Sequence, residues 1–199
     1  MACANIALAV LAAGAASRFG GRKLEALLGE EVIGALTAKR LVSIDFIYKL
    51  AICNMVDRRL IQNLTALKFS IITNLNPADG MSASISLAAQ AAKALPVEGL
   101  LIILADMPSV TVEHIEAMIS AFKPPMQTIA SHHNGVAMPP ALFPRAQFDA
   151  LSKLSGPKGA QALLKNSLLI AANADDLIDI DTRDDFQVLL SNKMKRKTI

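Results

Sequence analysis

The chain has little of several things that specialised folds and binding surfaces require. Only two of its 199 residues are cysteines, Cys3 and Cys53, and they lie far apart, so neither a disulfide framework nor a zinc module is encoded. Tryptophan is absent and tyrosine occurs once, which leaves no set of aromatic residues on which nucleic-acid bases could stack. These absences favour a cytoplasmic protein with reduced thiols and no nucleic-acid partner.

Long hydrophobic runs are also missing. No apolar stretch approaches the ~18 to 20 residues that a membrane-spanning helix needs, so no membrane segment is expected. Residues 6–17 have the apolar core and small-residue exit of a secretory signal. However, no lysine or arginine precedes them, and Arg18 follows them, so we do not expect a signal peptide.

The positive charge is concentrated at one end of the chain. The formal net charge is +3, but four of the 20 Lys and Arg residues lie in the last seven positions, and the rest of the chain is close to neutral. With 53% hydrophobic residues, the length fits one well-buried domain. We therefore predict one domain over residues 1–192 and a solvated basic tail over residues 193–199.

Short, bulky apolar runs alternate with amphipathic segments. The runs are typical of strands buried on both faces of a parallel sheet, and they cover residues 6–11, 46–53, 69–73, 100–106 and 127–131. Apolar residues near a 3.6 period indicate helices over residues 34–42, 57–67, 84–95 and 111–122. This alternation predicts an α/β fold, a single-domain, doubly wound, mostly parallel sheet. Thr111 is the expected N-cap of the last helix, and MPPALFP and LSGPKGA are expected to be loops.

The turn after the first predicted strand is rich in glycine and in positive charge. Its glycines let backbone N–H groups approach an anion closely, and its cations add charge. The residues concerned are Gly14, Gly20, Gly21, Arg18, Arg22 and Lys23. The spacing is neither that of a P-loop nor the GxGxxG of dinucleotide-binding folds, which argues against a dinucleotide-dependent redox protein. On these features alone, a plain surface loop is the alternative.

The stretch LAAGAASRFGGRKL resembles the signature LAAGxSxRxGxxK of nucleotidyltransferases, and most closely the molybdenum cofactor cytidylyltransferase-like (MobA/MocA-like) group. The resemblance covers nearly the whole chain and implies a Rossmann-like nucleotidyltransferase fold. It also implies that the loop backbone wraps a nucleoside triphosphate while two catalytic cations neutralise the phosphates. The nucleotide-binding residues implied here are Leu11, Ala12, Ala13, Gly14 and Gly20, and the catalytic ones are Lys23 and Arg18.

A second stretch of the resemblance lies after the third predicted strand. On its own, NLNPADGMSASISL indicates a turn followed by a helix start. It is similar to the family's NPxxxxGMSxSL, although one residue shorter between Pro77 and Gly80. The resemblance implies that Asn76, Gly80 and Ser84 hold the base and ribose of the nucleotide.

Asp106 ends the most apolar predicted strand. A carboxylate there could cap the following helix, or it could be a hard oxygen ligand for Mg²⁺, which takes one or two carboxylates together with substrate phosphates. The segment LADMPSV is similar to the family's LADMPxV, whose aspartate binds the catalytic metal. The resemblance therefore favours the metal role.

A pair of aspartates occurs near the end of the chain, in LIDIDTRDDF. Asp179 and Asp181 would share one face of a short strand, because strand side chains alternate. The segment is similar to the family's DIDTPEDL, and we choose Asp181 as the second Mg²⁺ ligand. The alternative is structural, since Thr182 and Asp185 have the spacing of a capping box at a helix start.

The segments GVAMPPALFPR and LSGPKGA resemble those that shape the family's pocket for the second substrate. Met138 stands where the family usually has glycine and Pro157 where it has aspartate, so the identity of the acceptor is open. We do not expect the histidines to bind a metal ion. We place His114 on an exposed helix position and His132 and His133 in a loop or at the rim of a pocket.

The resemblance implies transfer of CMP from CTP to a phosphorylated small molecule, most simply molybdopterin or molybdenum cofactor, with Mg²⁺ as cofactor and pyrophosphate as product. The preference for CTP depends on Ala13, because guanylyl-transferring relatives have LAGG at this position. A molybdoenzyme or its chaperone would then receive the product. Two alternatives stay open: a nucleotidyltransferase for a sugar phosphate or polyol phosphate, and a non-catalytic relative that binds nucleotide.

Overall fold

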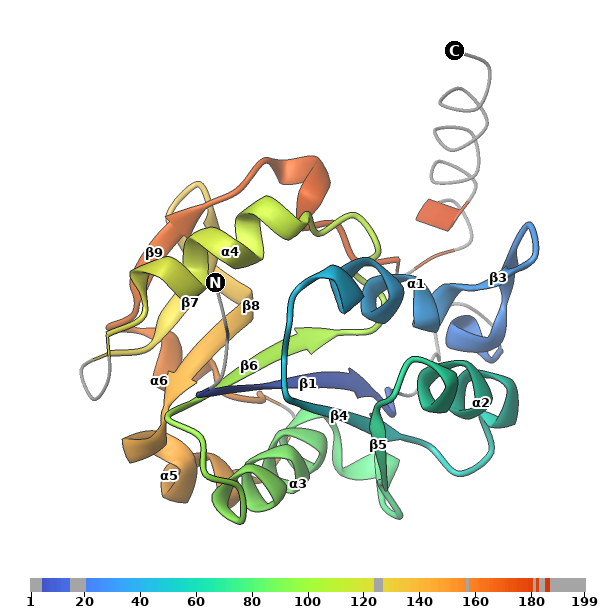
Figure 1. The fold of residues 1–199 in the computed structure, drawn as a ribbon, viewed down its shortest axis with the longest axis horizontal. Helices are drawn as coiled ribbons and strands as arrows, with labels where there is room; N and C mark the ends of the chain where they lie inside the picture. The colour runs from blue at the N-terminus through green and yellow to red at the C-terminus, as the bar shows by residue number, and fades with distance from the viewer. Residues whose placement is uncertain are drawn as a thin grey trace.

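The computed structural model describes residues 5–14, 21–123, 127–156, 158–180, 182 and 185–186. Its main feature is a seven-stranded sheet in the order β5-β4-β1-β6-β8-β7-β9 (Figure 1). These strands are β1 (Ile6–Ala12), β4 (Tyr48–Cys53), β5 (Ser70–Thr73), β6 (Gly99–Leu104), β7 (Ile129–His133), β8 (Val136–Pro144) and β9 (Leu168–Ala171). A separate antiparallel hairpin consists of β2 (Leu27–Leu28) and β3 (Glu31–Val32).

The helices in the described ranges fall between these strands. The α-helices are α1 (Ile33–Arg40), α2 (Arg58–Ala66), α3 (Met81–Lys93), α4 (Val112–Ala121), α5 (Phe148–Ser152) and α6 (Gln161–Leu164). The short 3-10 turns are η1 (Lys23–Glu25), η2 (Leu41–Ser43), η3 (Pro77–Asp79), η4 (Arg145–Gln147) and η5 (Ala174–Asp176).

The first half of the sheet is parallel, as the apolar runs predicted. Strand β1 pairs in parallel with β4 and β6, and β4 pairs in parallel with β5. All seven residues of β1 are buried, because alternate side chains enter two apolar clusters on opposite faces. The predicted strands therefore form within a few residues of their expected bounds.

Helices cover both faces, so the sheet is doubly wound. One apolar cluster joins Leu8 of β1 to Leu60 of α2 and Ile115 of α4, and the other joins Leu11 of β1 to Ile85 of α3. Figure 1 shows α1 and α4 on one side of β1, and α3 and α5 on the other. The predicted fold class, a doubly wound and mostly parallel α/β sheet, is confirmed.

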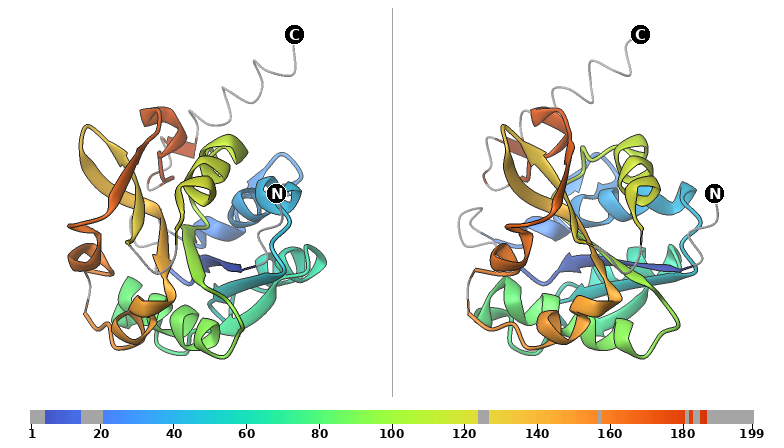
Figure 2. Two further views of the ribbon diagram at one scale, coloured as in Figure 1. Left: turned by 60° about the vertical axis from the view of Figure 1, so that its left-hand side comes forward. Right: turned by 90° about the vertical axis from the view of Figure 1, so that its left-hand side faces the viewer.

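The prediction of a loop over MPPALFP is wrong. This segment belongs to β8, which pairs antiparallel with β6 and β7. Pro139 and Pro140 lie at a shift in register opposite Ala130 and Ser131, so they occupy no position in the ladder of β7. A bulge tolerates proline because no ladder hydrogen bond is lost there. Strand β9, which the sequence did not indicate, completes this half, and Figure 2 shows β7, β8 and β9 turned steeply away from β1 and β4.

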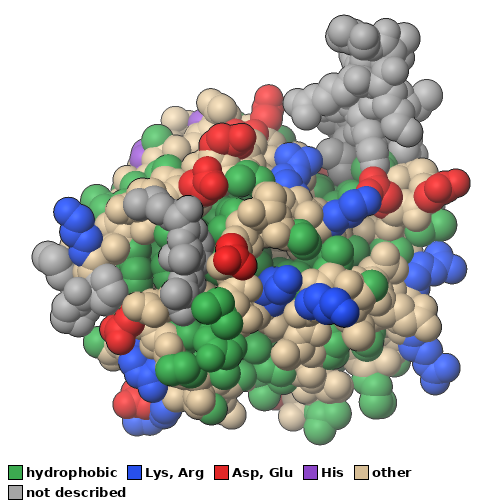
Figure 3. Space-filling model, viewed as in Figure 1, with side chains coloured by type: hydrophobic (Ala, Val, Ile, Leu, Met, Phe, Trp, Pro, Cys, Tyr) green, Lys and Arg blue, Asp and Glu red, His purple; other side chains and the backbone are tan. Residues whose placement is uncertain are grey.

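The carboxyl ends of β1, β4, β5 and β6 share one edge of the sheet, which is where ligands bind in folds of this type. On the face drawn in Figure 3, Lys and Arg side chains are interspersed with Asp and Glu, so this face has no continuous cationic surface among its described residues. No helix in the described ranges is both long enough and apolar enough to cross a membrane.

Candidate active site at the carboxyl edge of the sheet

An ion pair between Lys23 and Asp106 lies at this edge. Lys23 begins η1 in the turn after β1, and Asp106 follows the end of β6. The Lys23 Nζ and the Asp106 Oδ2 are 2.6 Å apart, and the two side chains are 9% and 19% exposed. Because β1 and β6 are neighbours, their turns meet, and two of the predicted site residues come into contact across 83 positions of sequence.

The backbone that carries Asp106 is held from three sides. The Ala105 N–H donates to the Leu11 carbonyl at 3.0 Å, and the Thr37 hydroxyl donates to the Ala105 carbonyl at 3.0 Å. The Ile180 N–H donates to the Asp106 carbonyl at 2.9 Å. Asp106 does not cap the next helix, because α4 begins after Thr111, whose hydroxyl accepts the cap hydrogen bond as predicted. The alternative structural role for Asp106 is therefore excluded.

The short turn η1 is anchored beneath Lys23. Leu24 is buried and packs against α1 at Gly34, where an added Cβ would lie 2.9 Å from the Leu24 Cβ and 3.1 Å from its carbonyl oxygen. Only glycine permits this approach of helix and turn. The packing of Leu24 therefore holds η1, and with it the backbone of Lys23, against α1.

The start of the glycine-rich loop leaves space at the end of β1. Leu11, Ala12 and Ala13 are buried, whereas Gly14 is exposed, and a Cβ on Gly14 would meet no described atom within 4 Å. Packing within the described chain therefore does not require glycine at this position. The predicted residues Arg18 and Gly20 lie outside the described residues.

The turn after β5 is organised by a residue that the sequence did not single out. Asn74 is buried, and its Nδ2 donates to the Ser84 hydroxyl at 3.1 Å while its Oδ1 accepts from the Asn76 N–H at 2.9 Å. Ser84 is thus a buried support for Asn74, and Asn76 is exposed at the rim of the turn. An asparagine directly after a strand was the signal that could have identified Asn74.

Helix α3 begins at this turn with an unusual feature. Gly80 is its N-cap residue and has φ +81°, a conformation that favours glycine. At the second residue of the helix, the Ser82 hydroxyl is buried and has no hydrogen-bond partner among the described residues. A buried hydroxyl at a helix N-terminus is a ready donor or acceptor for a bound group.

The C-terminal aspartates are not presented by a strand. Residues 178–180 have no regular secondary structure, and Ile180 is buried against Leu28 and Ile33 instead. The predicted strand is therefore wrong, because burial of Ile180 and its bond to Asp106 draw the segment across the sheet edge. Asp181 itself lies outside the described residues.

The predicted capping box in this segment is present. The Asp185 carboxylate accepts from the Thr182 N–H at 2.7 Å, and the Thr182 hydroxyl accepts from the Asp185 N–H at 3.2 Å. The structural alternative for these two residues is therefore confirmed, and it leaves the proposed metal role of Asp181 untested.

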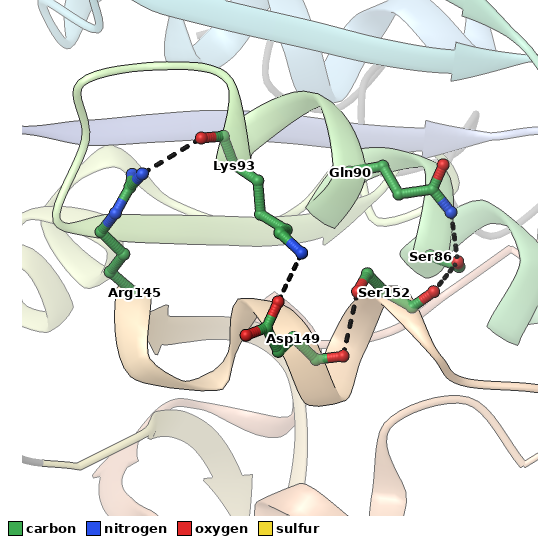
Figure 4. A network of polar contacts seen from close by, with 6 residues as sticks. All are labelled: Ser86, Gln90, Lys93, Arg145, Asp149 and Ser152. Atoms are coloured by element: carbon green, nitrogen blue, oxygen red, sulfur yellow. Dashed lines mark hydrogen bonds and ion pairs between the residues drawn. The ribbon is translucent and has the colours of Figure 1, made fainter.

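The segment that resembles the family's acceptor region serves partly to join α3 to α5. Figure 4 shows Arg145 directed at the end of α3, where its guanidinium donates to the carbonyl of Lys93 and to two carbonyls that follow. Lys93 forms an ion pair with Asp149, and the Ser86 hydroxyl donates to the Ser152 carbonyl at 2.6 Å. Arg145 therefore caps a helix C-terminus. Pro157, one of the two departures from the family pattern, lies outside the described residues.

The expectation of an exposed His114 is wrong. This residue is 8% exposed on α4, and its Nε2 lies 2.8 Å from the buried Ser131 hydroxyl. The hydroxyl donates to the Pro140 carbonyl at 2.9 Å, so the imidazole donates to the hydroxyl. The other two histidines are on or at the end of β7 rather than in a loop.

Burial lowers the pKa of His114, and the charge of Asp176 offsets this in part. The folded state therefore favours the neutral imidazole, and the unfolded chain binds the proton more readily below its ordinary pKa of about 6.5. We expect the free energy of unfolding to fall as the pH drops below about 6.5, and His114→Gln to weaken this dependence. Urea unfolding at pH 7.5 and 5.5 measures it, with His132→Gln as the control. Equal pH dependence in the wild type and the His114 variant would contradict the assignment.

Asp106 is the candidate carboxylate for a metal ion among the described residues of this edge. The described residues contain no group of three or more His, Cys, Asp or Glu side chains that could hold a metal. Asp106 nevertheless fits a cation that takes most of its ligands from water and substrate, because its carboxylate is partly exposed and no described group donates a hydrogen bond to its Oδ1.

Comparison with known proteins gives this arrangement a family. The Bacillus subtilis (strain 168) purine catabolism protein PucB is 27% identical in an alignment of length 193, with 90% of this chain and 93% of that protein covered. A nucleotidyl transferase from Methanothermobacter has a TM-score of 0.82 at 15% identity, with 96% of this chain and 99% of that chain covered. The manganese complex of Rv0371c from Mycobacterium tuberculosis H37Rv has a TM-score of 0.76 at 20% identity, with 94% and 98% covered. Both solved structures share the fold.

The family model for the MobA-like NTP transferase domain matches residues 8–173, which include the turn after β1, the turn after β5 and Asp106. On this match, the chain belongs to the MobA-like NTP transferase family.

Proposed function

We propose that the protein transfers CMP from CTP to a phosphorylated acceptor, namely molybdopterin or molybdenum cofactor, and releases pyrophosphate. The observation that carries the proposal is the 2.6 Å contact between Lys23 and Asp106. It joins a cation suited to phosphates and a carboxylate suited to a metal ion at the sheet edge where ligands bind. The membership in a family of NTP transferases supports the same chemistry.

The proposed reaction requires no protein base. A phosphate oxygen of the acceptor, already an anion, attacks the α-phosphorus of CTP. A new P–O bond forms, the bond between the α-phosphorus and the bridging oxygen breaks, and pyrophosphate leaves with the bonding electrons. Catalysis then depends on positioning and charge stabilisation, which the Lys23 ammonium supplies directly, together with Arg18.

The nucleotide would lie between the first loop and the start of α3. Backbone groups of residues 11–14, the open space at Gly14 and the cation of Lys23 suit a triphosphate. Asn76 and Gly80 would contact base and ribose, and the unpartnered Ser82 hydroxyl adds a polar contact that the sequence did not identify. Ala13 supports CTP over GTP.

We assign Mg²⁺ to Asp106, with Asp181 as the second ligand. When bound, the ion would polarise phosphate oxygens and neutralise charge that develops on the leaving pyrophosphate. The manganese complex of a structural neighbour supports a divalent cation in this fold. We place the enzyme in the cytoplasm, which suits the free Cys53 thiol.

A thermal-shift screen with CTP, GTP, ATP and UTP, each with Mg²⁺, tests the proposal. A triphosphate at 100 times its Kd should add about 2.7 kcal/mol to the free energy of unfolding. We expect the largest rise in Tm with CTP. An unchanged Tm with all four triphosphates would contradict the central proposal.

Pyrophosphate release then identifies the acceptor. Release with molybdopterin or molybdenum cofactor supports the full proposal, and release with a sugar phosphate or polyol phosphate would replace the acceptor while keeping the reaction. Binding of CTP without release for any acceptor would indicate a non-catalytic relative.

A further inference from the structure

We propose that Glu25 is a positioning residue, whose carboxylate ties η1 to the N-terminus of α2 and so holds the Lys23 ammonium opposite Asp106. The Glu25 Oε1 accepts from the Arg59 N–H at 2.7 Å and from the Leu60 N–H at 3.3 Å. These contacts join segments that are 34 and 35 positions apart in the sequence. The inference rests on the proposed function, because it concerns the catalytic use of Lys23.

Helix α2 depends on this carboxylate for its cap. The first N–H groups of a helix have no partner within the helix, and a negative charge at that end is favourable. Asp57 occupies the N-cap position of α2, but its side chain makes no cap hydrogen bond. Glu25 therefore does from a distant loop what the N-cap residue usually does locally.

Asp57 lies at the same helix terminus but in different surroundings. Asp57 is 8% exposed, and burial, followed by the charge of Glu25, raises its pKa, while Arg22 acts in the opposite direction. Arg22 also lies 3.5 Å from the Glu25 Oε2. Two carboxylates thus lie at the N-terminus of α2. Of the two, Glu25 accepts hydrogen bonds from the helix N–H groups, and Asp57 does not.

The turn η1 has only three residues, so a change at Glu25 is transmitted to Lys23 through the backbone. The Ala26 N–H donates to the Lys23 carbonyl at 3.1 Å, and the Glu25 N–H donates to the Arg22 carbonyl at 3.1 Å. Three consecutive side chains leave this turn in different directions: Lys23 to Asp106, Leu24 into the core and Glu25 to α2. Release of Glu25 would let the turn rotate about Leu24 and would displace the lysine.

Two substitutions separate the carboxylate's hydrogen bonds from its charge. Glu25→Ala removes both acceptors, whereas Glu25→Gln keeps an oxygen that can accept from the same two N–H groups. Asp57→Asn is the matched control, because it changes the other carboxylate at the same helix terminus.

In the pyrophosphate-release assay of the full-length protein, we expect Glu25→Ala to lower kcat about 10- to 30-fold with the KM for CTP changed less than threefold, as expected when a positioning contact is lost. Glu25→Gln and Asp57→Asn should stay within threefold of the wild-type kcat. Circular dichroism and Tm check that each variant is folded. A wild-type kcat in Glu25→Ala, or an equal loss in Asp57→Asn, would overturn the proposal.

A second readout needs no activity, so failure of the proposed function is distinguishable from failure of this inference. Lysine acetylation followed by mass spectrometry compares the labelling rate of Lys23 with that of the exposed Lys39 in each folded variant. We expect Lys23 to label at least fivefold faster in Glu25→Ala than in the wild type, and at the wild-type rate in Glu25→Gln and Asp57→Asn. Unchanged Lys23 labelling in Glu25→Ala would overturn the positioning role, whatever reaction the enzyme catalyses.

Discussion

Lys23→Ala is expected to lower kcat/KM for CTP about 10²- to 10³-fold, the range seen when one preorganised group that stabilises transition-state charge is removed. The ammonium is nearly buried and lies 2.6 Å from Asp106, so its removal takes a positive charge out of the interior of the site. Steady-state pyrophosphate release measures the effect. The larger part should appear in kcat, because charge on the phosphates grows in the transition state.

Lys39→Ala is the matched control for this substitution. Lys39 is exposed on α1 and pairs with Glu31 at 2.6 Å, so its removal also breaks a lysine–carboxylate contact, but at the surface. Such a pair contributes little, and kcat/KM should stay within twofold. A loss below about tenfold in Lys23→Ala, equivalent to ~1.4 kcal/mol, would contradict a transition-state role for Lys23.

Asp106→Asn should abolish metal-dependent turnover, with a fall in kcat of at least about 10³-fold, while the fold stays intact. The amide keeps the size of the side chain, and the Asp106 backbone bond to Ile180 does not involve the side chain. What the variant loses is the negative charge, which is what a hard divalent cation requires of its ligand. Turnover measured over a range of Mg²⁺ and Mn²⁺ concentrations tests this, because a weakened site should need far more metal.

Asp149→Asn provides the comparison. It removes an exposed carboxylate that pairs with Lys93 between α3 and α5, away from the carboxyl edge of the sheet (Figure 4). Its metal dependence should match the wild type. If Asp106→Asn retained the metal dependence of the wild type, the metal would have to be held by other residues.

The parallel half of the fold could be predicted because each strand there is buried on both faces. Such strands read as continuous apolar runs, and the amphipathic segments between them show one face to the sheet. Strand β8 was not predicted because prolines are normally excluded from strands. Only the pairing with β7 shows that these prolines fall in a bulge. The burial of His114 was not predicted for a related reason: its partner Ser131 lies on a different element, β7, which the pattern of its own helix does not reveal.

The candidate site, too, could be predicted from the sequence only in part. The residue types in the turn after β1 and at Asp106 are compatible with phosphate and metal chemistry, and the resemblance to the family favours those roles over a plain loop and a helix cap. Glu25 belongs to no motif that marks it, and Asn74 is marked only by its place directly after a strand. Asn74 forms its hydrogen bonds within a turn that is defined only by the folded backbone. Glu25 forms its hydrogen bonds to a helix that is remote in the sequence.

The sequence by itself determined the fold class, the succession of strands and helices along the parallel half of the chain, and the chemical character of Lys23 and Asp106. It could do so because hydrophobic period and residue type are local properties. Only the tertiary structure decided that these two side chains meet, since the contact depends on β1 and β6 being neighbours in the sheet. It also decided that Glu25 rather than Asp57 caps α2, because that choice depends on where a distant turn packs.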